Sequence, residues 1–108
     1  MDHVFITFQH AVQKGVTIGY GTDAGVYPHG QNAREFALLV KSGMTPINAL
    51  KAATSVDATL LGISDRLGAL QPGKIADVIA VPGNPTQDIR LTEKVMFVMK
   101  EGMIYRRP

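Results

Sequence analysis

A short apolar run near the N-terminus constrains the fold of this chain more than any other feature. Val16-Thr17-Ile18-Gly19-Tyr20-Gly21 is β-branched, aromatic and apolar, with almost no polar break. Such a run is typical of a strand covered on both faces in a parallel sheet. A parallel strand needs parallel neighbours, whereas the segments that follow predict helices and then a small sheet. We therefore expect the neighbouring strands to lie upstream of these 108 residues.

Glycines mark the predicted ends of the helices. Residues 4–14 carry apolar side chains at helical spacing, and Gly15 follows them directly. Gly43 and Gly62 stand in the same way after helices that we expect to end near Ser42 and Leu61. Glycine just past the last helical residue is a common stop signal, because it adopts the left-handed conformation without strain.

Two patterns predict helix starts. Asn32 followed by Glu35 resembles a capping box, in which both side chains satisfy backbone amides of the first turn. Thr45-Pro46 places a hydroxyl at the cap and a proline at the first helical position. A further short helix is expected from about Ser55.

From Leu67 onward the composition changes from helix to sheet. Glycines and prolines punctuate the chain, and three strands are expected at Ile75–Val81, Lys94–Lys100 and Met103–Arg106. Glu101-Gly102 between the last two predicts a tight hairpin turn. We expect the methionines at 96, 99 and 103 to lie in the core and Lys74 and Asp77 to have structural roles.

Composition excludes several classes of protein. The formal net charge of +2 comes from interspersed basic residues, so no basic face for nucleic acid is visible. The chain has no cysteine, which leaves histidine, aspartate and glutamate as candidate metal ligands. No apolar run approaches membrane-spanning length and no signal segment is visible at the start. We expect a soluble, cytoplasmic protein with neither a membrane nor a nucleic-acid partner.

Asp23 is the candidate catalytic residue. It follows the apolar strand directly, within Gly21-Thr22-Asp23-Ala24-Gly25, and small neighbours would let a metal or a substrate approach the carboxylate. In α/β proteins the carboxyl ends of strands open onto the ligand crevice. The alternative is that Asp23 only forms a turn, since aspartate in glycine-rich segments commonly bonds its own backbone.

Three stretches together resemble the amidohydrolase superfamily, in particular its imidazolonepropionase-like enzymes and prolidase-like Xaa-Pro dipeptidases. The stretches are Gly15 to Gly25, then His29-Gly30 through Gly43-Met44-Thr45-Pro46 to Ala52-Ala53-Thr54, and finally Leu67 to Val78 with Pro72-Gly73-Lys74. The resemblance is collinear over essentially the whole chain. It implies an α/β fold, with residues 1–66 forming the C-terminal part of a TIM barrel and residues 67–108 strands of a flanking β-sandwich.

The resemblance also implies a role for Asp23 and a metal. In such enzymes this aspartate contacts a divalent ion, here expected to be zinc, and acts as general base in hydrolysis of a C–N bond. The other ligands come from upstream segments, and His3, His10 and His29 lack the spacing to replace them. We therefore expect a missing N-terminal barrel portion as partner, a small-molecule or dipeptide substrate, and a fragment that is inactive and metal-free by itself.

Several alternatives remain open from the sequence. His29 either contacts substrate or is a polar loop residue. Glu35 is interpreted as a capping residue and not as an acid catalyst. The chain as a whole could instead be a non-catalytic module that self-associates or swaps domains through exposed strand and helix faces. Phosphate binding by the glycine-rich loop is a weaker hypothesis, because neither a Walker spacing nor a Gly-x-Gly-x-x-Gly match is present.

Overall fold

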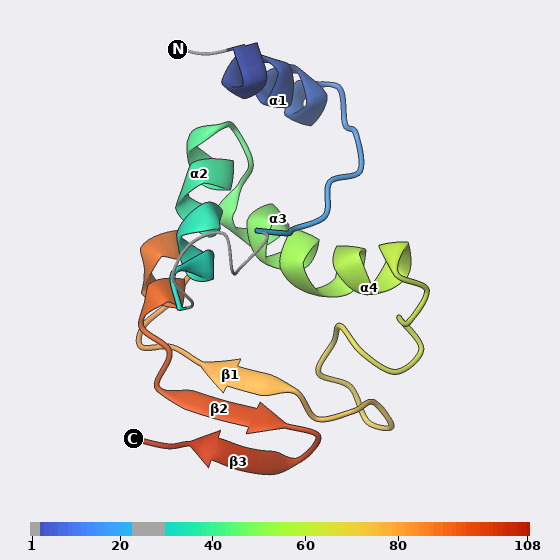
Figure 1. Ribbon diagram of the computed structural model, residues 1–108, viewed down its shortest axis with the longest axis vertical. Helices are drawn as coiled ribbons and strands as arrows, with labels where there is room; N and C mark the ends of the chain where they lie inside the picture. The colour runs from blue at the N-terminus through green and yellow to red at the C-terminus, as the bar shows by residue number, and fades with distance from the viewer. Residues whose placement is uncertain (1–2, 23–29) are drawn as a thin grey trace.

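The computed structural model describes residues 3–22 and 30–108, with helices at one end and a small sheet at the other (Figure 1). The helices cluster above the sheet, and the segment after the first helix runs down along them. In chain order the elements are α1 (His3–Gln13), η1 (Asn32–Arg34), α2 (Glu35–Lys41), α3 (Pro46–Lys51), η2 (Ala52–Val56), α4 (Asp57–Leu60), β1 (Val78–Ala80), η3 (Ile89–Glu93), β2 (Phe97–Lys100) and β3 (Met103–Arg106).

The three predicted helix ends are confirmed. Gly15, Gly43 and Gly62 all have positive φ, of 74°, 112° and 73°. In each case the residue after the glycine donates its amide hydrogen to a carbonyl five residues back, as in Met44 to Leu39 at 3.2 Å and Ile63 to Ala58 at 2.9 Å. This is the Schellman pattern, which satisfies carbonyls that a helix end leaves without partners.

Of the two predicted helix starts, one is confirmed and one is wrong. Thr45 adopts an extended conformation and its hydroxyl accepts the amide hydrogen of Asn48 at 3.2 Å, with Pro46 at the first helical position. The capping box at Asn32 and Glu35 does not form, because a 3₁₀ turn precedes α2 and neither helix start has a side-chain cap. Glu35 is therefore not a capping residue.

A single helix replaces the two short ones expected between residues 45 and 61. α3 continues without a break through η2, a π-helical turn, into α4. The hydroxyls of Thr54 and Thr59 donate to the carbonyls of Leu50 at 2.8 Å and Ser55 at 3.0 Å. Because these hydroxyls are satisfied within the helix, they do not cap a new one.

The three predicted strands are present; β3 has the predicted bounds, and β1 and β2 are shorter than expected. They form an antiparallel sheet in the order β1-β2-β3, with a register shift between Val98 and Met99. Lys100 pairs with Met103 across a two-residue turn in which both Glu101 (φ 52°) and Gly102 (φ 81°) have positive φ. Positive φ at both positions is the mark of a type I′ hairpin, so this predicted turn is confirmed.

The predicted strand at Val16–Gly21 is wrong for the described chain, since residues 16–22 have no regular structure. Val16 is 57% exposed, the opposite of what a strand covered on both faces requires. The physical reason is that a parallel strand exists only as part of a ladder. No other strand of the described chain pairs with this segment, because all the sheet pairing joins β1, β2 and β3.

The core is small and the molecule is open for its size. Its buried apolar residues are Leu39, Ala49, Ala52, Ala58 and Ile89. The accessible surface is 7696 Å², against about 5,800 Å² expected for a compact monomer of this mass. The radius of gyration is 14.6 Å, against about 13 Å for a compact domain of 100 residues.

The sheet contributes much of the exposed apolar surface. Every residue of β3 is exposed, and Met103 is 62% exposed. Met96 is also exposed, so the expectation that Met96 and Met103 lie in the core is wrong. Met99 is half-buried. A sheet needs a second layer to bury one face, and the described residues do not provide a complete one. Together with the open shape, this indicates that these elements lack packing partners.

Candidate functional site

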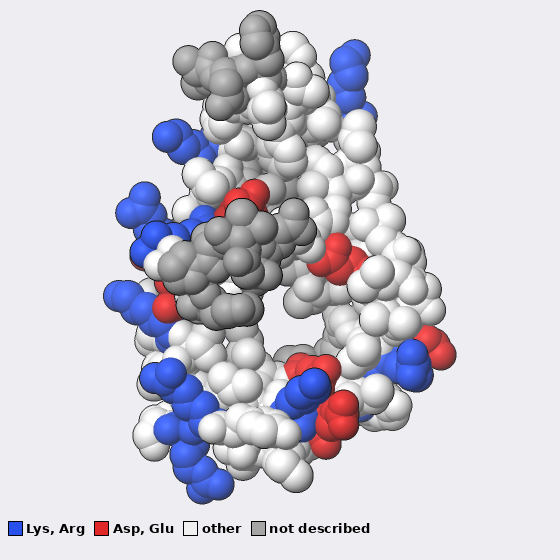
Figure 2. All heavy atoms as spheres, in the orientation of Figure 1, with Lys and Arg blue, Asp and Glu red and all other residues white. Residues whose placement is uncertain are grey.

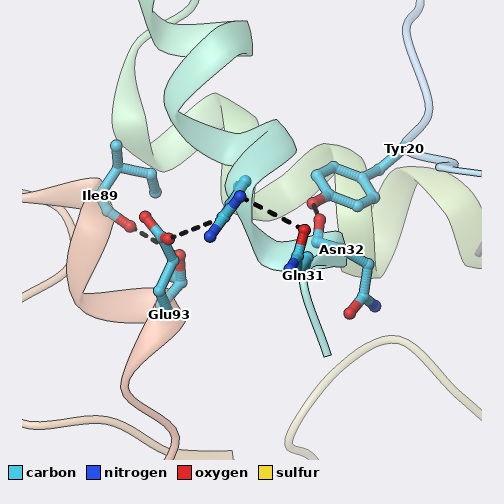
Figure 3. A network of polar contacts seen from close by, with 7 residues as sticks. Tyr20, Gln31, Asn32, Ile89 and Glu93 are labelled. Atoms are coloured by element: carbon cyan, nitrogen blue, oxygen red, sulfur yellow. Dashed lines mark hydrogen bonds and ion pairs between the residues drawn. The ribbon is translucent and has the colours of Figure 1, made fainter. Parts of the chain in front are cut away.

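Tyr20 joins the segment after α1 to three helical elements. Its backbone amide donates to Oδ1 of Asp57 in α4 at 2.9 Å. Its ring packs on Phe36 of α2, with the ring centroids 4.5 Å apart and the planes tilted by 35°. Its hydroxyl donates to the carbonyl oxygen of Asn32 in η1, as Figure 3 shows. These contacts fix the backbone just before Asp23.

Gly19 is needed for this approach. A Cβ built on Gly19 would lie 2.3 Å from Oδ1 of Asp57 and 2.8 Å from Cδ1 of Leu60. Separations below 3 Å are well inside van der Waals contact. The segment therefore lies directly against α4, and only a residue without a side chain fits there.

Asp57 is a residue of this region that the sequence analysis missed. The hydrogen bond to Tyr20 joins residues 37 positions apart, so no local pattern announces it. The one available signal was a carboxylate alone in an otherwise uncharged stretch, residues 52–64, because such a residue needs a polar partner when it is half-buried.

Asp23 and His29, the residues proposed from the sequence for catalysis and substrate contact, lie outside the described residues. The glycine-rich loop considered for phosphate binding falls largely in the same gap, residues 23–29. The described residues end at Thr22, which is half-buried, and resume at Gly30. The roles of Asp23 and His29 stay predictions.

The remaining titratable candidates do not form a metal site in the described part of the chain. Among residues 3–22 and 30–108 no three histidine, aspartate or glutamate side chains are grouped so that they could hold an ion. His3 and His10 both belong to α1, as expected, and His10 is exposed. Glu35 is half-buried, and desolvation raises the pKa of its carboxyl above the ordinary value.

Lys74 and Asp77 have structural roles, as predicted. Nζ of Lys74 donates to the carbonyl oxygen of Ser64 at 2.6 Å, which closes the loop before the sheet. Oδ1 of Asp77 accepts the amide hydrogen of Glu101 at 2.8 Å and so fastens the hairpin turn to the beginning of β1. Both side chains are thus engaged with backbone groups.

A second polar cluster joins η1 to η3. Nη1 of Arg34 donates to Oε1 of Gln31 at 3.3 Å, and its Nε lies 3.9 Å from Oε1 of Glu93 (Figure 3). The Arg34 side chain is 66% exposed, so this ion pair contributes at most about 1 kcal/mol. This cluster joins η1 to η3, and we assign it a structural role.

Two hollows border the helical elements. One of about 750 Å³ lies between the helices and the sheet and is lined mainly by apolar residues, including Leu50, Leu61 and Val78, with Asp57 among its few charged ones. The space-filling view shows the molecule hollowed in this region (Figure 2). Another of about 350 Å³ borders residues 15–18, the segment predicted to be a barrel strand.

Among the helices of residues 3–22 and 30–108, none is both long and apolar enough to cross a bilayer.

Comparison with solved structures shows what this arrangement resembles. The crystal structure of a Xaa-Pro dipeptidase with bound methionine matches 95% of this chain with a TM-score of 0.92 and 48% identity. That match covers 25% of the dipeptidase chain. An amidohydrolase from Thermotoga maritima MSB8 matches 96% of this chain with a TM-score of 0.78 and 29% identity, over 26% of its own length.

Curated relatives point the same way. Ochratoxinase from Aspergillus niger is 40% identical over 106 residues, which is 94% of this chain and 22% of ochratoxinase. Imidazolonepropionase from Deinococcus deserti is 37% identical over 84 residues, 75% of this chain and 21% of that enzyme. The chain thus spans about a quarter or less of the length of these relatives.

The family model for the amidohydrolase family matches residues 3–106, nearly the whole sequence. The expected resemblance to prolidase-like members is confirmed by the dipeptidase structure. This chain belongs to the amidohydrolase family.

Proposed function

We propose that this chain is the C-terminal portion of a metal-dependent hydrolase that acts on C–N bonds, and that Asp23 is its metal-contacting general base. The observation that carries the proposal is the match of 95% of the chain to a quarter of a Xaa-Pro dipeptidase at 48% identity. Amide, cyclic amide and dipeptide bonds are the substrate classes considered, and a dipeptide is favoured by that likeness.

Asp23 would act as a proton carrier. A divalent ion, when bound, lowers the pKa of the attacking water to about 7. The Asp23 carboxylate would accept a proton from the attacking water and would later pass it to the leaving nitrogen, which otherwise is a poor leaving group. We further propose that His29, six residues after Asp23 in the sequence, contacts the substrate.

The donors present here suit a divalent ion but are too few to hold one. Carboxylate oxygen is a good ligand, yet catalytic zinc normally has three protein ligands. The described residues supply no such set. We infer that the other ligands, and the metal itself, belong to the upstream part of the enzyme, so that this portion is inactive alone.

The incomplete packing supports the same view. The excess accessible surface, the exposed β3 and the two hollows are what a unit would show when its barrel neighbours and the second layer of its sandwich are missing. We assign residues 1–66 to the barrel and 67–108 to the sandwich. A cytoplasmic location, which the absence of cysteine favours, is part of the proposal.

The decisive experiment compares Asp23→Asn with the parent in the full-length protein that contains this chain. The amide keeps the shape of the carboxylate but cannot take a proton, so we expect kcat to fall by about 10²- to 10⁴-fold. Asp65→Asn is the matched control, because Asp65 is exposed and lies in another loop. Unchanged turnover in Asp23→Asn would refute the base assignment.

Self-association is the alternative that the exposed apolar faces favour. In that case a second copy, and not an upstream barrel, would cover β3 and the hollows. Sedimentation of the isolated 108-residue chain distinguishes the two. A defined oligomer that unfolds cooperatively supports a self-associating module, and aggregation or a loosely packed monomer supports a portion of a larger enzyme.

A further inference from the structure

We propose that Asp57 is a positioning residue that fixes the backbone of residues 19–22 by accepting the amide hydrogen of Tyr20, and thereby orients the aspartate that follows. This inference rests on the proposed role of Asp23. It assigns Asp57 no contact with substrate.

The hydrogen bond itself has the geometry of a firm contact. The distance from the Tyr20 nitrogen to Oδ1 of Asp57 is 2.9 Å, at the centre of the usual range. No strand of the described chain pairs with residues 16–22, and the Tyr20 amide is paired with this side chain. A hydrogen bond to a carboxylate is stronger than one between neutral groups, which suits a group that must hold a backbone segment still.

The helix that carries Asp57 is a rigid support. Ala52 and Ala58, on either side of Asp57 in the same helix, are 1% and 4% exposed. A Cβ on Gly68 would lie 2.5 Å from the Cβ of Ala58, so the following loop packs directly against this turn. Close packing on both sides leaves the Asp57 backbone little freedom to move.

A π-helical turn determines which way Asp57 faces. η2 occupies Ala52–Val56, and Asp57 is the first residue after it. A π turn holds one residue more than an α turn, so the residues after it are rotated by about 100° relative to an uninterrupted α-helix. Asp57 therefore faces Tyr20 because of this turn, and π turns are frequent at functional sites.

Tyr20 is held on its other sides as well. Its ring packs on Phe36, and its hydroxyl donates to the carbonyl of Asn32 (Figure 3). Elements on both sides of the glycine-rich loop therefore converge on one residue. Asp57 supplies the backbone anchor among these contacts. Tyr20 is three residues before Asp23, so we expect a shift of the Tyr20 backbone to displace the Asp23 carboxylate.

The test uses Asp57→Ala and Asp57→Asn in the full-length protein, with Asp65→Ala as the control. Amide hydrogen exchange at Tyr20 is measured in metal-free protein, and kcat and KM in the active form. We expect Asp57→Ala to exchange at least tenfold faster at Tyr20 and to lose up to about a hundredfold in kcat, with KM within about twofold because substrate contacts are untouched.

Asp57→Asn should restore both properties, since its amide oxygen accepts the same hydrogen bond. Asp65→Ala should match the parent. A merely structural role would lower the folded fraction of Asp57→Ala without the selective loss of kcat and the rescue by asparagine. Exchange at Tyr20 unchanged in Asp57→Ala, or kcat unchanged despite faster exchange, overturns the proposal.

Two further outcomes keep the inference separate from the proposed function. If Asp57→Ala does not fold, Gly19→Ala is used instead, because its added Cβ would lie 2.3 Å from Oδ1 of Asp57 and displace that carboxylate. Unchanged amide exchange at Tyr20 in Gly19→Ala also overturns the inference. Amide exchange at Tyr20 does not depend on catalysis. If turnover is unchanged in Asp23→Asn, the base assignment is refuted, and exchange at Tyr20 still tests whether Asp57 anchors that residue.

Discussion

Replacing Gly68 with alanine should destabilise the protein through a close approach between the loop and the helix. Gly68 has φ +97°, and a Cβ there would meet the Cβ of Ala58 at 2.5 Å and the carbonyl oxygen of Thr54 at 2.9 Å. Neither atom can move away easily, because the Ala58 side chain is buried and the Thr54 carbonyl belongs to the backbone of the same helix. Overpacking of this kind costs about 1–3 kcal/mol, and the left-handed backbone adds about 1–2 kcal/mol for a residue with a side chain.

The expected loss in the free energy of unfolding is therefore about 2–5 kcal/mol, a large part of the 5–15 kcal/mol typical of a domain. Gly73→Ala is the matched control, since Gly73 has φ +88° but nothing within 4 Å of the added Cβ. It should show only the backbone cost of about 1–2 kcal/mol.

Urea denaturation of both variants and the parent gives the comparison, with the slopes checked for equality before the midpoints are converted to free energies. If Gly68→Ala loses no more than Gly73→Ala, the loop does not pack on the helix as described, and the rigid support inferred for Asp57 is lost with it.

Two further predictions concern Glu35 and the hairpin. Burial raises the pKa of the Glu35 carboxyl in the folded state, so the folded state binds more protons than the unfolded one and its stability falls as pH rises through that pKa. Glu35→Gln should therefore be more stable than the parent above this pH range and lose that advantage below about pH 4. Urea denaturation at several pH values measures the difference, and a difference that does not depend on pH would contradict the prediction. Glu101 has φ 52° in the two-residue turn, and asparagine tolerates that conformation better, so Glu101→Asn should raise the free energy of unfolding by up to about 1 kcal/mol; a lower midpoint in thermal or urea melts would count against the turn geometry.

Most local signals in the sequence predicted local structure, and the capping box at Asn32 and Glu35 is the exception. Glycine after an apolar helical run, threonine before proline, and glutamate-glycine between two strands each act within a few residues, and Gly43, Thr45 and Gly102 all behave as predicted. These motifs satisfy backbone groups of their own turn, so they need no distant partner.

Features that depend on distant partners could not be predicted in the same way. The apolar run at Val16 has the composition of a buried strand, but a strand forms only beside others. The hydrogen bond from Tyr20 to Asp57 spans 37 residues, and no pattern marks the π turn that makes it possible. The candidate site residues Asp23 and His29 lie outside the described residues, so their roles stay predictions.

The π turn at Ala52–Val56 also restricts how this helix can be altered. Side chains there can be exchanged as long as their size suits the packing, but the number of residues cannot change. Loss of one residue would convert the turn to regular helix and swing Asp57, Ala58 and Leu60 away from their present neighbours together. Insertions and deletions in this stretch should therefore be tolerated far less than substitutions, which is a practical guide for anyone shortening or grafting the helix.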